Sequence, residues 1–297
     1  MGKQVNTETI LIYPCEFGKL NKVDIDYTFE KAIADKNGIR NYLFNYDEYI
    51  TLDKGLKLNK EDKEPEKINA VYRGWMLNAE QYDKLYNDLV DKYNIRLVNT
   101  PEEYEHAHYF NNAYYKLADY TPKVAIFNKD EVCDIDWDEI KGYFKRFVIK
   151  DFVKSVKGWE FPEYFDYTYT NEQLSEYLNK FIELRGDLYT GGIIFKEYVE
   201  LDRTNGNTHE FRAFYKKGRI VALYHNSNNY EDDLKQVRKF AEVIPKLDSK
   251  FYTIDFAIKN NGDIIIIECG DGQVSGLPSQ NEVEQLYENL FKQINLN

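Results

Sequence analysis

The sequence contains few of the residues on which the most familiar catalytic and metal sites depend. Its three cysteines are scattered and form no Cys-x-x-Cys pair, so a zinc site is not indicated. Only four histidines are present, and neither a Ser–His–Asp nor a Cys–His arrangement can be argued from their positions. A Walker-type P-loop and a Gly-x-Gly-x-x-Gly motif are also missing. Scattered cysteines of this kind are typical of reduced, buried thiols in a cytoplasmic protein.

Long apolar runs and basic clusters are missing as well. No stretch approaches the roughly 20 apolar residues that a membrane-spanning helix needs, and no signal-peptide pattern opens the sequence. No run of five basic residues occurs, and the formal net charge is −12. Because duplex DNA is bound by basic stripes, we expect neither duplex nucleic acid nor a membrane as a partner.

Hydrophobic and aromatic residues, by contrast, are abundant. They make up 43% and 16% of the 297 residues, and 26 of these residues are tyrosine. This composition indicates a globular protein, and the length is enough for two or three compact units around a large core.

Strands and helices alternate through the first part of the chain, which predicts an α/β domain over residues 1–118. The helix signals are specific. Asn37-Gly38 would end one helix, Asn78 would cap the next, and Thr100-Pro101 would begin a third. The expected strands cover 9–13, 39–46, 68–75 and 95–99, and the expected helices cover 27–36, 79–93 and 101–118.

After Pro122 the pattern changes to an α+β arrangement with antiparallel sheets. The expected strands and helices alternate first and then give way to two hairpins. Strands are expected at 123–127, 146–155 and 191–201, helices at 134–144, 171–185, 231–244 and 281–293, and hairpins at 209–225 and 251–268.

The hairpin within residues 251–278 places two acids in an otherwise apolar strand pair. Asn261-Gly262 is the preferred dipeptide of a two-residue type I′ loop, and with that loop Asp255 lies directly opposite Glu268. Like charges across a ladder repel, so one interpretation is a cation between the carboxylates, and oxygen ligands favour Mg²⁺ or Mn²⁺. A half-exposed hairpin with two solvated acids explains the pattern equally well.

Two lysines project from the predicted strand 146–155. Lys150 and Lys154 share one face by the period of two, and a Gly-containing loop over 155–158 follows. Lysines on a strand beside such a loop suit the oxygens of a polyphosphate. The alternative is an edge strand that its lysines protect from aggregation.

Four further positions are candidate site residues. Glu197 and Glu200, at the polar end of a strand, could reach an amino group or a ribose, although an ordinary strand terminus is the simpler interpretation. Arg212 lies on a strand with a buried face and needs an anion partner, which could be Glu210, the acids of the hairpin or a ligand phosphate. Arg73 ends a strand of the first domain, where ligands of open α/β sheets bind, or it lies at the surface.

Taken in order, these features resemble those of the ATP-grasp fold, in which two α+β lobes clamp ATP between them. The shared order is a lysine strand with a Gly-containing loop, a strand end with glutamates, an arginine strand and a final acid pair. More narrowly, RGWML, IKDFVKS, EFRAF and IECGDGQVSGLP are similar to a bacterial and phage ATP-grasp clade that is named for one arginine and two lysines. By this resemblance those residues are Arg73, Lys150 and Lys154.

The resemblance also implies a domain organisation and a set of ligands. An α/β domain over 1–118 would precede a small lobe over 119–201 and a C-terminal lobe over 202–297, and ATP would bind with Mg²⁺ or Mn²⁺. Gly270 stands where many ATP-grasp enzymes carry a metal-binding asparagine, so Asp271 is the nearest replacement. By the resemblance, Lys150 and Lys154 would bind the α- and β-phosphates of ATP, with Lys157 as a further ATP ligand. Adenine would be held by Glu197, Tyr198 and Val199, and the ribose by Glu200 or Asp202. The implied metal ligands are Asp255, Glu268 and Asp271, and the implied catalytic residues are Arg212, Arg73 and Lys154.

The activity that the resemblance implies is ATP-dependent ligation of a carboxylate to an amine. An acyl phosphate would form and ADP and phosphate would be released, with small molecules or peptides as the carboxylate and amine substrates. Two alternatives stay open, namely a kinase of the same fold that phosphorylates a hydroxyl, and a nucleotide-binding interaction module without turnover. Release of phosphate separates the ligase from the kinase.

Overall fold

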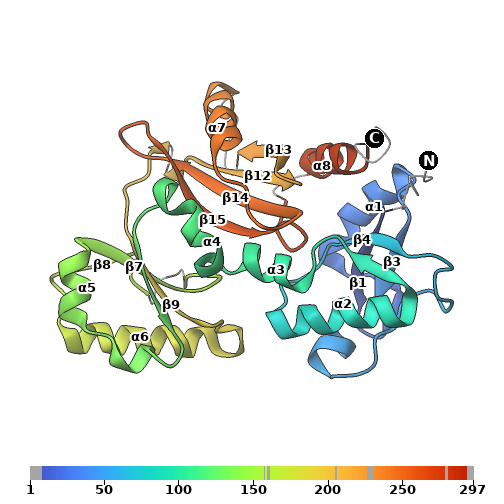
Figure 1. Ribbon diagram of the computed structural model, residues 1–297, viewed down its shortest axis with the longest axis horizontal. Coiled ribbons are helices and arrows are strands. Elements are labelled where there is room, and N and C mark those ends of the chain that lie inside the picture. Colours follow the sequence, from blue (N-terminus) through green and yellow to red (C-terminus); the bar gives the residue numbers. More distant parts are fainter. Residues whose placement is uncertain are drawn as a thin grey trace, which may run out of the picture.

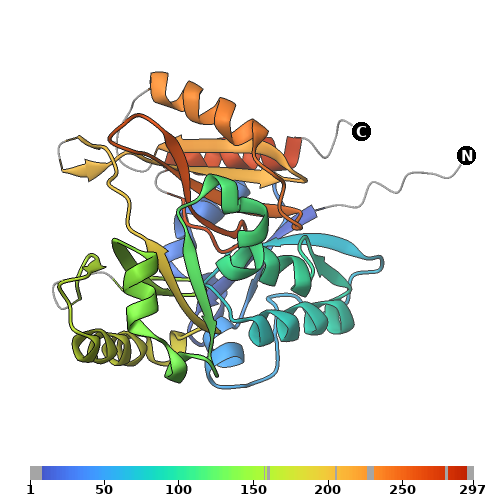
Figure 2. The ribbon, with the colours of Figure 1, turned by 60° about the vertical axis from the view of Figure 1, so that its left-hand side comes forward.

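The computed structural model describes residues 9–156, 158, 161–204, 206–225, 231–277 and 280–292. Three main sheets, each built from a different stretch of the chain, carry helices on their faces (Figure 1). The first is an α/β sheet and the other two are antiparallel, which confirms the predicted fold class. In both views two short helices, α3 and α4, lie at the centre of the molecule among the three sheets (Figures 1 and 2).

The first sheet is mostly parallel. Strand β1 pairs in parallel with β3 and β4 and antiparallel with β2, a short strand that the sequence did not predict. β4 then pairs with β5. The elements are β1 (Thr9–Glu16), β2 (Lys19–Val23), α1 (Thr28–Lys36), β3 (Asn41–Phe44), β4 (Ile68–Tyr72), α2 (Ala79–Tyr93) and β5 (Ile95–Leu97).

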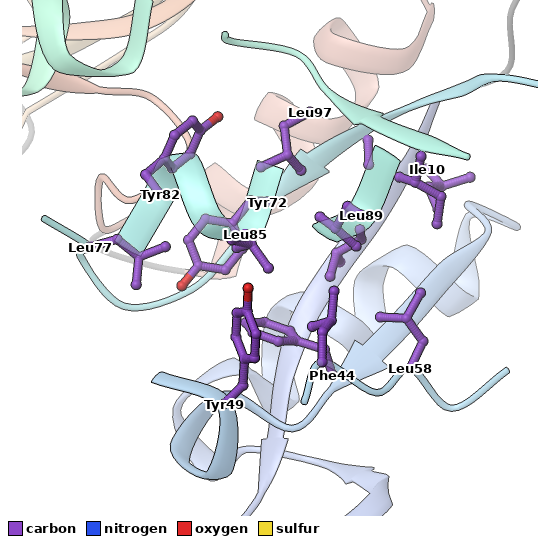
Figure 3. Packing of buried hydrophobic residues seen from close by; sticks show 14 of the residues in the cluster. Ile10, Phe44, Tyr49, Leu58, Tyr72, Leu77, Tyr82, Leu85, Leu89 and Leu97 are labelled. Atoms are coloured by element: carbon purple, nitrogen blue, oxygen red, sulfur yellow. The ribbon is translucent and has the colours of Figure 1, made fainter. Parts of the chain in front are cut away.

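Helix α2 begins and ends where the sequence predicts. Asn78 accepts a hydrogen bond from Gln81 N at 2.8 Å, and the Gln81 side chain accepts one from Asn78 N at 3.0 Å, which together form a capping box. The apolar face of α2 packs on the sheet to form one core of the protein (Figure 3). Residues of this core that Figure 3 labels include Ile10, Phe44, Tyr72, Tyr82, Leu85 and Leu89.

The predicted helix 101–118 is two helices, α3 (Pro101–His108) and α4 (Phe110–Leu117). Tyr109 breaks the helix because its backbone is extended, with φ −97° and ψ 111°. Phe110 N then donates to Phe152 O at 2.8 Å, so the turn is fixed by the residue that follows β7 of the second sheet. The break brings His108 and Phe110 to the region between the sheets.

The second sheet has the strand order β6-β9-β7-β8. Helices α5 and α6 cover one of its faces, where Phe147 and Phe195 enter a core with Leu174 and Phe181. The opposite face looks toward α4 and the third sheet. The elements are β6 (Val124–Asn128), α5 (Trp137–Tyr143), β7 (Arg146–Asp151), β8 (Phe165–Asp166), α6 (Asn171–Arg185) and β9 (Gly192–Glu197).

The third sheet has the strand order β13-β12-β14-β15 and a helix on each face. Helix α7 packs through Val237 against Phe211, while α8 packs through Leu286 against Phe214. A small strand pair, β10 (Arg203–Thr204) and β11 (Asn207–Thr208), precedes the sheet. The remaining elements are β12 (Glu210–Lys216), β13 (Arg219–His225), α7 (Glu231–Val243), β14 (Phe251–Ile258), β15 (Ile264–Asp271) and α8 (Gln280–Lys292).

The first and third sheets share a core. Leu11 and Tyr13 of β1 lie in the same buried cluster as Phe214 of β12 and Tyr287 of α8. Tyr13 and Tyr287 also form a hydrogen bond between their hydroxyls at 2.8 Å. The first domain and the C-terminal lobe therefore do not pack as independent units. The domain boundaries at residues 118 and 201 stay predictions. No helix within the described ranges is long and apolar enough to cross a membrane.

The loop of the β14–β15 hairpin differs from the predicted type I′ turn. Gly262 has φ +86°, but Asn261 does not have the positive φ that type I′ requires. Gly262 N donates to Lys259 O, and Lys259 N donates to Asp263 O, so the loop has three residues and ends in a left-handed glycine. The dipeptide with two positive φ values is Lys217-Gly218, between β12 and β13.

Candidate active site

A small cavity of about 60 Å³ lies where the first sheet, the α3–α4 connection and the two antiparallel sheets meet. Met76 and His108 line it from the first domain and α3, and Lys154 lines it from the segment after β7. Its floor belongs to the third sheet and the loop that follows it. The other lining residues are Val153, Arg212, Thr253, Asp255, Glu268, Cys269, Gly270, Val274, Ser275 and Gly276.

The predicted acid pair is confirmed. Asp255 of β14 is the register partner of Glu268 of β15, and three further pairs from Tyr252–Asp271 to Ile254–Cys269 follow the predicted register. Beyond Asp255 a bulge shifts the pairing by one residue. The three-residue loop shifts the register of the hairpin by one residue, and the bulge shifts it back. Asp255 therefore still lies opposite Glu268, as predicted.

Arg212 neutralises Asp255. The two residues face each other on β12 and β14, and the guanidinium binds both carboxylate oxygens, with Nε–Oδ1 and Nη2–Oδ2 distances of 2.7 Å. The remaining nitrogen, Nη1, donates to Gly276 O at 3.1 Å. The sequence left several anion partners open for Arg212, and in the structure its partner is Asp255 of the acid pair.

Lys150 neutralises Glu268 from the second sheet. Its Nζ lies 3.1 Å from Glu268 Oε1, and the lysine side chain is almost fully buried. Burial raises the pKa of Glu268, but the charges of Lys150 and Lys154 outweigh this effect and lower it to about 2. Each acid of the repelling pair thus has its own cation, one from each antiparallel sheet.

The lysine strand ends earlier than predicted. β7 stops at Asp151, whose Oδ1 accepts hydrogen bonds from Val153 N at 2.7 Å and Lys154 N at 2.6 Å. This turn is closed by Asp151 N, which donates to Lys154 O at 2.9 Å. Lys150 and Lys154 therefore do not share a strand face, although both act on Glu268. Lys157, a predicted ATP ligand, lies outside the described residues.

The segment after β9, where adenine and ribose ligands were predicted, is held by the second sheet. Glu197 N donates to Lys123 O at 2.8 Å, and Tyr198 N donates to Arg146 O at 2.9 Å. Val199 follows, and Glu200 Oε1 then accepts a hydrogen bond from Arg146 Nη2 at 2.9 Å.

Asp202, also predicted to bind the ribose, has a partner in the C-terminal lobe. Its Oδ2 lies 3.1 Å from His209 Nδ1, and its backbone N–H donates to Ile258 O at 2.8 Å. The segment from β9 to Asp202 thus crosses from the second sheet to the third.

Arg73 does not lie at the cavity, contrary to its predicted catalytic role. It is fully buried and binds Glu30 through Nε and Nη2, both at 2.8 Å. Its Nη1 lies within 3.0 Å of the carbonyl oxygens of Gly272, Gln273 and Ser275. Burial lowers the pKa of Arg73, but the charge of Glu30 outweighs this and raises it. Arg73 therefore fixes the loop after β15, one side of the cavity, and does not line the cavity itself.

Asp271 is not brought to the other two acids, contrary to the predicted metal site. Its carboxylate is fully buried and accepts hydrogen bonds from Asn99 Nδ2 and, at 2.8 Å, from Gln273 N. Burial raises its pKa to about 7. Within the described part of the chain, no three His, Cys, Asp or Glu side chains converge on a metal position. The acid pair is thus a site of two carboxylates.

Packing explains why a residue without a side chain stands at position 270. A side-chain carbon at this position would lie 3.2 Å from Thr253 Oγ1 and 3.3 Å from Ser275 Oγ, which are hydrogen-bonded to each other at 2.7 Å. An asparagine at position 270 would therefore require this pair of hydroxyls to move.

Two residues at the site were missed from the sequence. His108 lines the cavity, and burial, followed by the charge of Lys154, lowers its pKa to about 3, so the imidazole is neutral. Lys196 of β9 is buried and reaches the third sheet, where its Nζ donates to Ile267 O at 2.6 Å. A signal for Lys196 existed, because it directly follows the apolar run Ile193–Phe195 within a strand.

Comparison with solved structures gives the same architecture over nearly the whole chain. A D-cycloserine synthetase matches with a TM-score of 0.58 and 13% identity, covering 96% of this chain and 99% of that one. The D-alanine–D-alanine ligase of Bacillus anthracis, complexed with ATP, matches with 0.56 and 14%, covering 98% of each. The ATP-grasp ligase PsnB, complexed with a precursor peptide and AMPPNP, matches with 0.53 and 9%, covering 99% of each.

No curated protein sequence matches the chain significantly. The sequence of residues 137–290, however, matches the ATP-grasp domain of family 3 in the clade named for one arginine and two lysines. This segment contains the lysine strand, Arg212 and the acid pair, although not Arg73, and it extends over more than half of the chain. The chain therefore belongs to family 3 of this arginine-and-two-lysine clade of ATP-grasp domains.

Proposed function

We propose that the protein is an ATP-dependent ligase that joins a carboxylate to an amine through an acyl phosphate and releases ADP and phosphate. The observation that carries the proposal is the pairing of Asp255 with Glu268 between two cations, Arg212 and Lys150, that come from the two antiparallel sheets. Family membership supports an ATP site between these sheets.

The acid pair fits a divalent cation. Both side chains are oxygen donors of the kind that Mg²⁺ and Mn²⁺ prefer, and they face each other on adjacent strands. Arg212 and Lys150 each bind one of the two carboxylates, which holds both oxygen donors in position. A bound Mg²⁺ or Mn²⁺ would neutralise charge on the phosphate oxygens of ATP during phosphoryl transfer.

The protein's own cations then have distinct tasks. Lys150 and Lys154 lie on the side of the second sheet and would bind phosphate oxygens, while Arg212 lies on the third sheet and would face the γ-phosphate. The substrate carboxylate would attack that phosphate, and an amine would later displace it from the acyl group. Fixed cations stabilise the charge that develops on the phosphoryl oxygens in both steps.

The nature of the substrates follows from the class of reaction. One substrate must carry a carboxylate and the other an amine, either as small molecules or as peptides. The similar folds of a D-alanine–D-alanine ligase and of a ligase complexed with a precursor peptide support both sizes of substrate. The first domain and α3 supply Met76 and His108 to the cavity and would contact the acceptor.

The proposal is tested by incubating the protein with ATP, Mg²⁺, a pool of amino acids and cell extract. We expect ADP and phosphate in equal amounts, together with a product whose mass is the sum of two components less one water. Asp255→Asn should abolish this product, while Asp263→Asn, a change in the exposed loop of the same hairpin, should not. A phosphorylated product without free phosphate would show a kinase, and no ADP with any substrate would show a binding module.

A further inference from the structure

Two hydroxyl groups lie beside the acid pair of the β14–β15 hairpin. Thr253 of β14 is the register partner of Gly270 of β15. Each of them lies two residues from the acid of its own strand, Asp255 or Glu268, and therefore shares the face of that acid. Thr253 and Ser275 also line the same small cavity as the two acids. Two carboxylates and two hydroxyls thus surround one cavity.

The missing side chain of Gly270 makes room for these hydroxyls. Thr253 Oγ1 and Ser275 Oγ lie 3.2 Å and 3.3 Å from the place where a side-chain carbon of residue 270 would be. The Thr253 side chain is buried there, with 2% of the residue exposed. An oxygen atom therefore lies next to the acid pair at this place in the ladder, although residue 270 itself supplies none.

The hydrogen bonds of the two hydroxyls leave Thr253 with free lone pairs. Ser275 Oγ donates its single proton to Asp271 O at 2.8 Å. In the 2.7 Å hydrogen bond between the two hydroxyls, Thr253 must therefore be the donor. The longer contact of Thr253 Oγ1 with Gly270 O, at 3.4 Å, also uses the threonine proton. Within the described residues nothing donates to Thr253 Oγ1, so this buried oxygen can still accept.

The two acids can accept further ligands as well. Arg212 makes one hydrogen bond to each carboxylate oxygen of Asp255, and a carboxylate oxygen has two lone pairs. Lys150 binds Oε1 of Glu268, and the other oxygen, Oε2, has no hydrogen bond to a described residue. Carboxylate oxygens are the ligands that Mg²⁺ and Mn²⁺ prefer, and threonine hydroxyls also bind Mg²⁺ in proteins. The oxygens beside the cavity thus match one class of cation.

We propose that Thr253 Oγ1 is a ligand of the divalent cation that the acid pair binds, so that Thr253, Asp255 and Glu268 together form the metal site. This assignment rests on the proposed function, because the cation belongs to that function. Ser275 is a positioning residue, since it accepts the Thr253 proton and so keeps the lone pairs of Oγ1 for the cation. The ligand set thus differs from two carboxylates alone by one neutral oxygen.

The test measures the affinity for Mn²⁺ and needs no substrate. Titrations with Mn²⁺, followed by the relaxation rate of water protons, are made on the protein alone and with a saturating non-hydrolysable ATP analogue. We expect Thr253→Val, which keeps the shape of the side chain but removes the oxygen, to bind Mn²⁺ roughly tenfold more weakly. Thr253→Ser keeps the hydroxyl and should bind Mn²⁺ nearly as tightly as the wild type does.

Thr121→Val is the matched control. Thr121 Oγ1 donates to Ile266 O of β15 at 2.9 Å, so its hydroxyl is bound to the same hairpin, but Thr121 is not among the residues that line the cavity. Its replacement should leave the affinity for Mn²⁺ at the wild-type value. A loss as large as that of Thr253→Val would show that Mn²⁺ binding responds to the packing of the hairpin, and would overturn the assignment.

A change of metal preference separates a ligand from a structural role, and it also covers the case in which Thr253→Val does not fold. Thr253→Cys replaces the oxygen by sulfur, which prefers the soft Cd²⁺ to Mn²⁺. Cd²⁺ should therefore displace bound Mn²⁺ from this variant at a roughly tenfold lower ratio of Cd²⁺ to Mn²⁺ than from the protein with Thr253. Both proteins carry Cys269→Ala, because Cys269 also lines the cavity.

The possible failures are distinguishable. If Thr253→Val binds Mn²⁺ as tightly as the wild type does, or if Thr253→Cys leaves the preference between Cd²⁺ and Mn²⁺ unchanged, Thr253 is not a ligand. If the wild type binds Mn²⁺ but Asp255→Asn binds it equally well, the cation lies elsewhere and the assignment fails with it. If the wild type binds Mn²⁺ neither alone nor with the ATP analogue, the proposed function itself fails.

Discussion

At the scale of single residues, the acid pair and Arg212 could be placed from the sequence, but Arg73 and Asp271 could not. Asp255, Glu268 and Arg212 lie on adjacent strands, so alternation and register fix their positions. The partners of Arg73 and Asp271 come from remote segments, namely Glu30, Asn99 and the loop after β15. A residue type and its strand position do not reveal such contacts.

Arg73 should prove essential for folding stability. Arg73→Met would leave Glu30 buried and unpaired and release three carbonyls of the 272–275 segment, at a cost of about 4 kcal/mol in the free energy of unfolding. Urea denaturation measures this loss, and Glu30→Gln in the same chain should recover part of it. A stable Arg73→Met protein that lacks only turnover would instead support the catalytic role expected from the sequence.

The charge of Glu268 should make stability depend on acid pH. Its folded pKa is about 2, below the ordinary value of 4.5, so the wild type gains stability that is fully present above pH 4.5 and lost as the pH falls toward 2. Unfolding free energies of the wild type and Glu268→Gln should therefore converge between these pH values. The exposed Glu176→Gln change in α6 is the control, and a constant difference from pH 6 to pH 2 would contradict the role of Lys150 and Lys154.

At the scale of elements, local signals were reliable and contacts from other elements were not predictable. Helices α2 and α6 begin at capping boxes, Asn78 and Thr170, and both have the predicted bounds. The break at Tyr109 depends on the carbonyl of Phe152, which lies in the remote segment directly after β7. The early end of β7 depends on the side chain of Asp151, and Arg185 holds that carboxylate at 2.7 Å. These interactions have no counterpart in the spacing of apolar residues.

The β14–β15 loop offers a clean test of its geometry. Gly262 has φ +86° and open space where a side chain would lie, so Gly262→Ala should cost about 1 kcal/mol through backbone strain alone. Gly142 in α5 has equal space and no positive φ, so Gly142→Ala should stabilise the protein by about 0.5 kcal/mol. Thermal unfolding measures both, and a neutral Gly262→Ala would contradict the three-residue loop.

At the scale of the whole molecule, the two antiparallel sheets are held together by two lysine bridges. Lys150 binds Glu268 and Lys196 binds Ile267 O, so both bridges run from β7 and β9 to β15. The cavity of about 60 Å³ between them is far smaller than the roughly 300–1,000 Å³ of a typical ligand pocket. The proposed binding of ATP between these sheets would therefore require the bridges to separate.

This separation can be followed by energy transfer between two dyes. Cys133 is exposed between β6 and α5, beside the second sheet, and Val243 is exposed at the end of α7, so Val243→Cys supplies the second position. Transfer efficiency should change when Mg²⁺ and a non-hydrolysable ATP analogue are added, because the sheets move apart. A label pair within the C-terminal lobe, Val243→Cys with Asn261→Cys in a Cys133→Ser background, should show no change. Unchanged efficiency at a saturating analogue concentration would contradict the opening.

The packing of α8 on β1 and α1 also has a consequence for biosynthesis. Leu286 and Tyr287 cover Leu11 and Tyr13, so one face of the first sheet is completed by a helix that is translated long after β1. During translation the N-terminal strands must wait, with that apolar face uncovered, until residue 292 has emerged. Nascent chains that stop before α8 should therefore be the ones that chaperones retain.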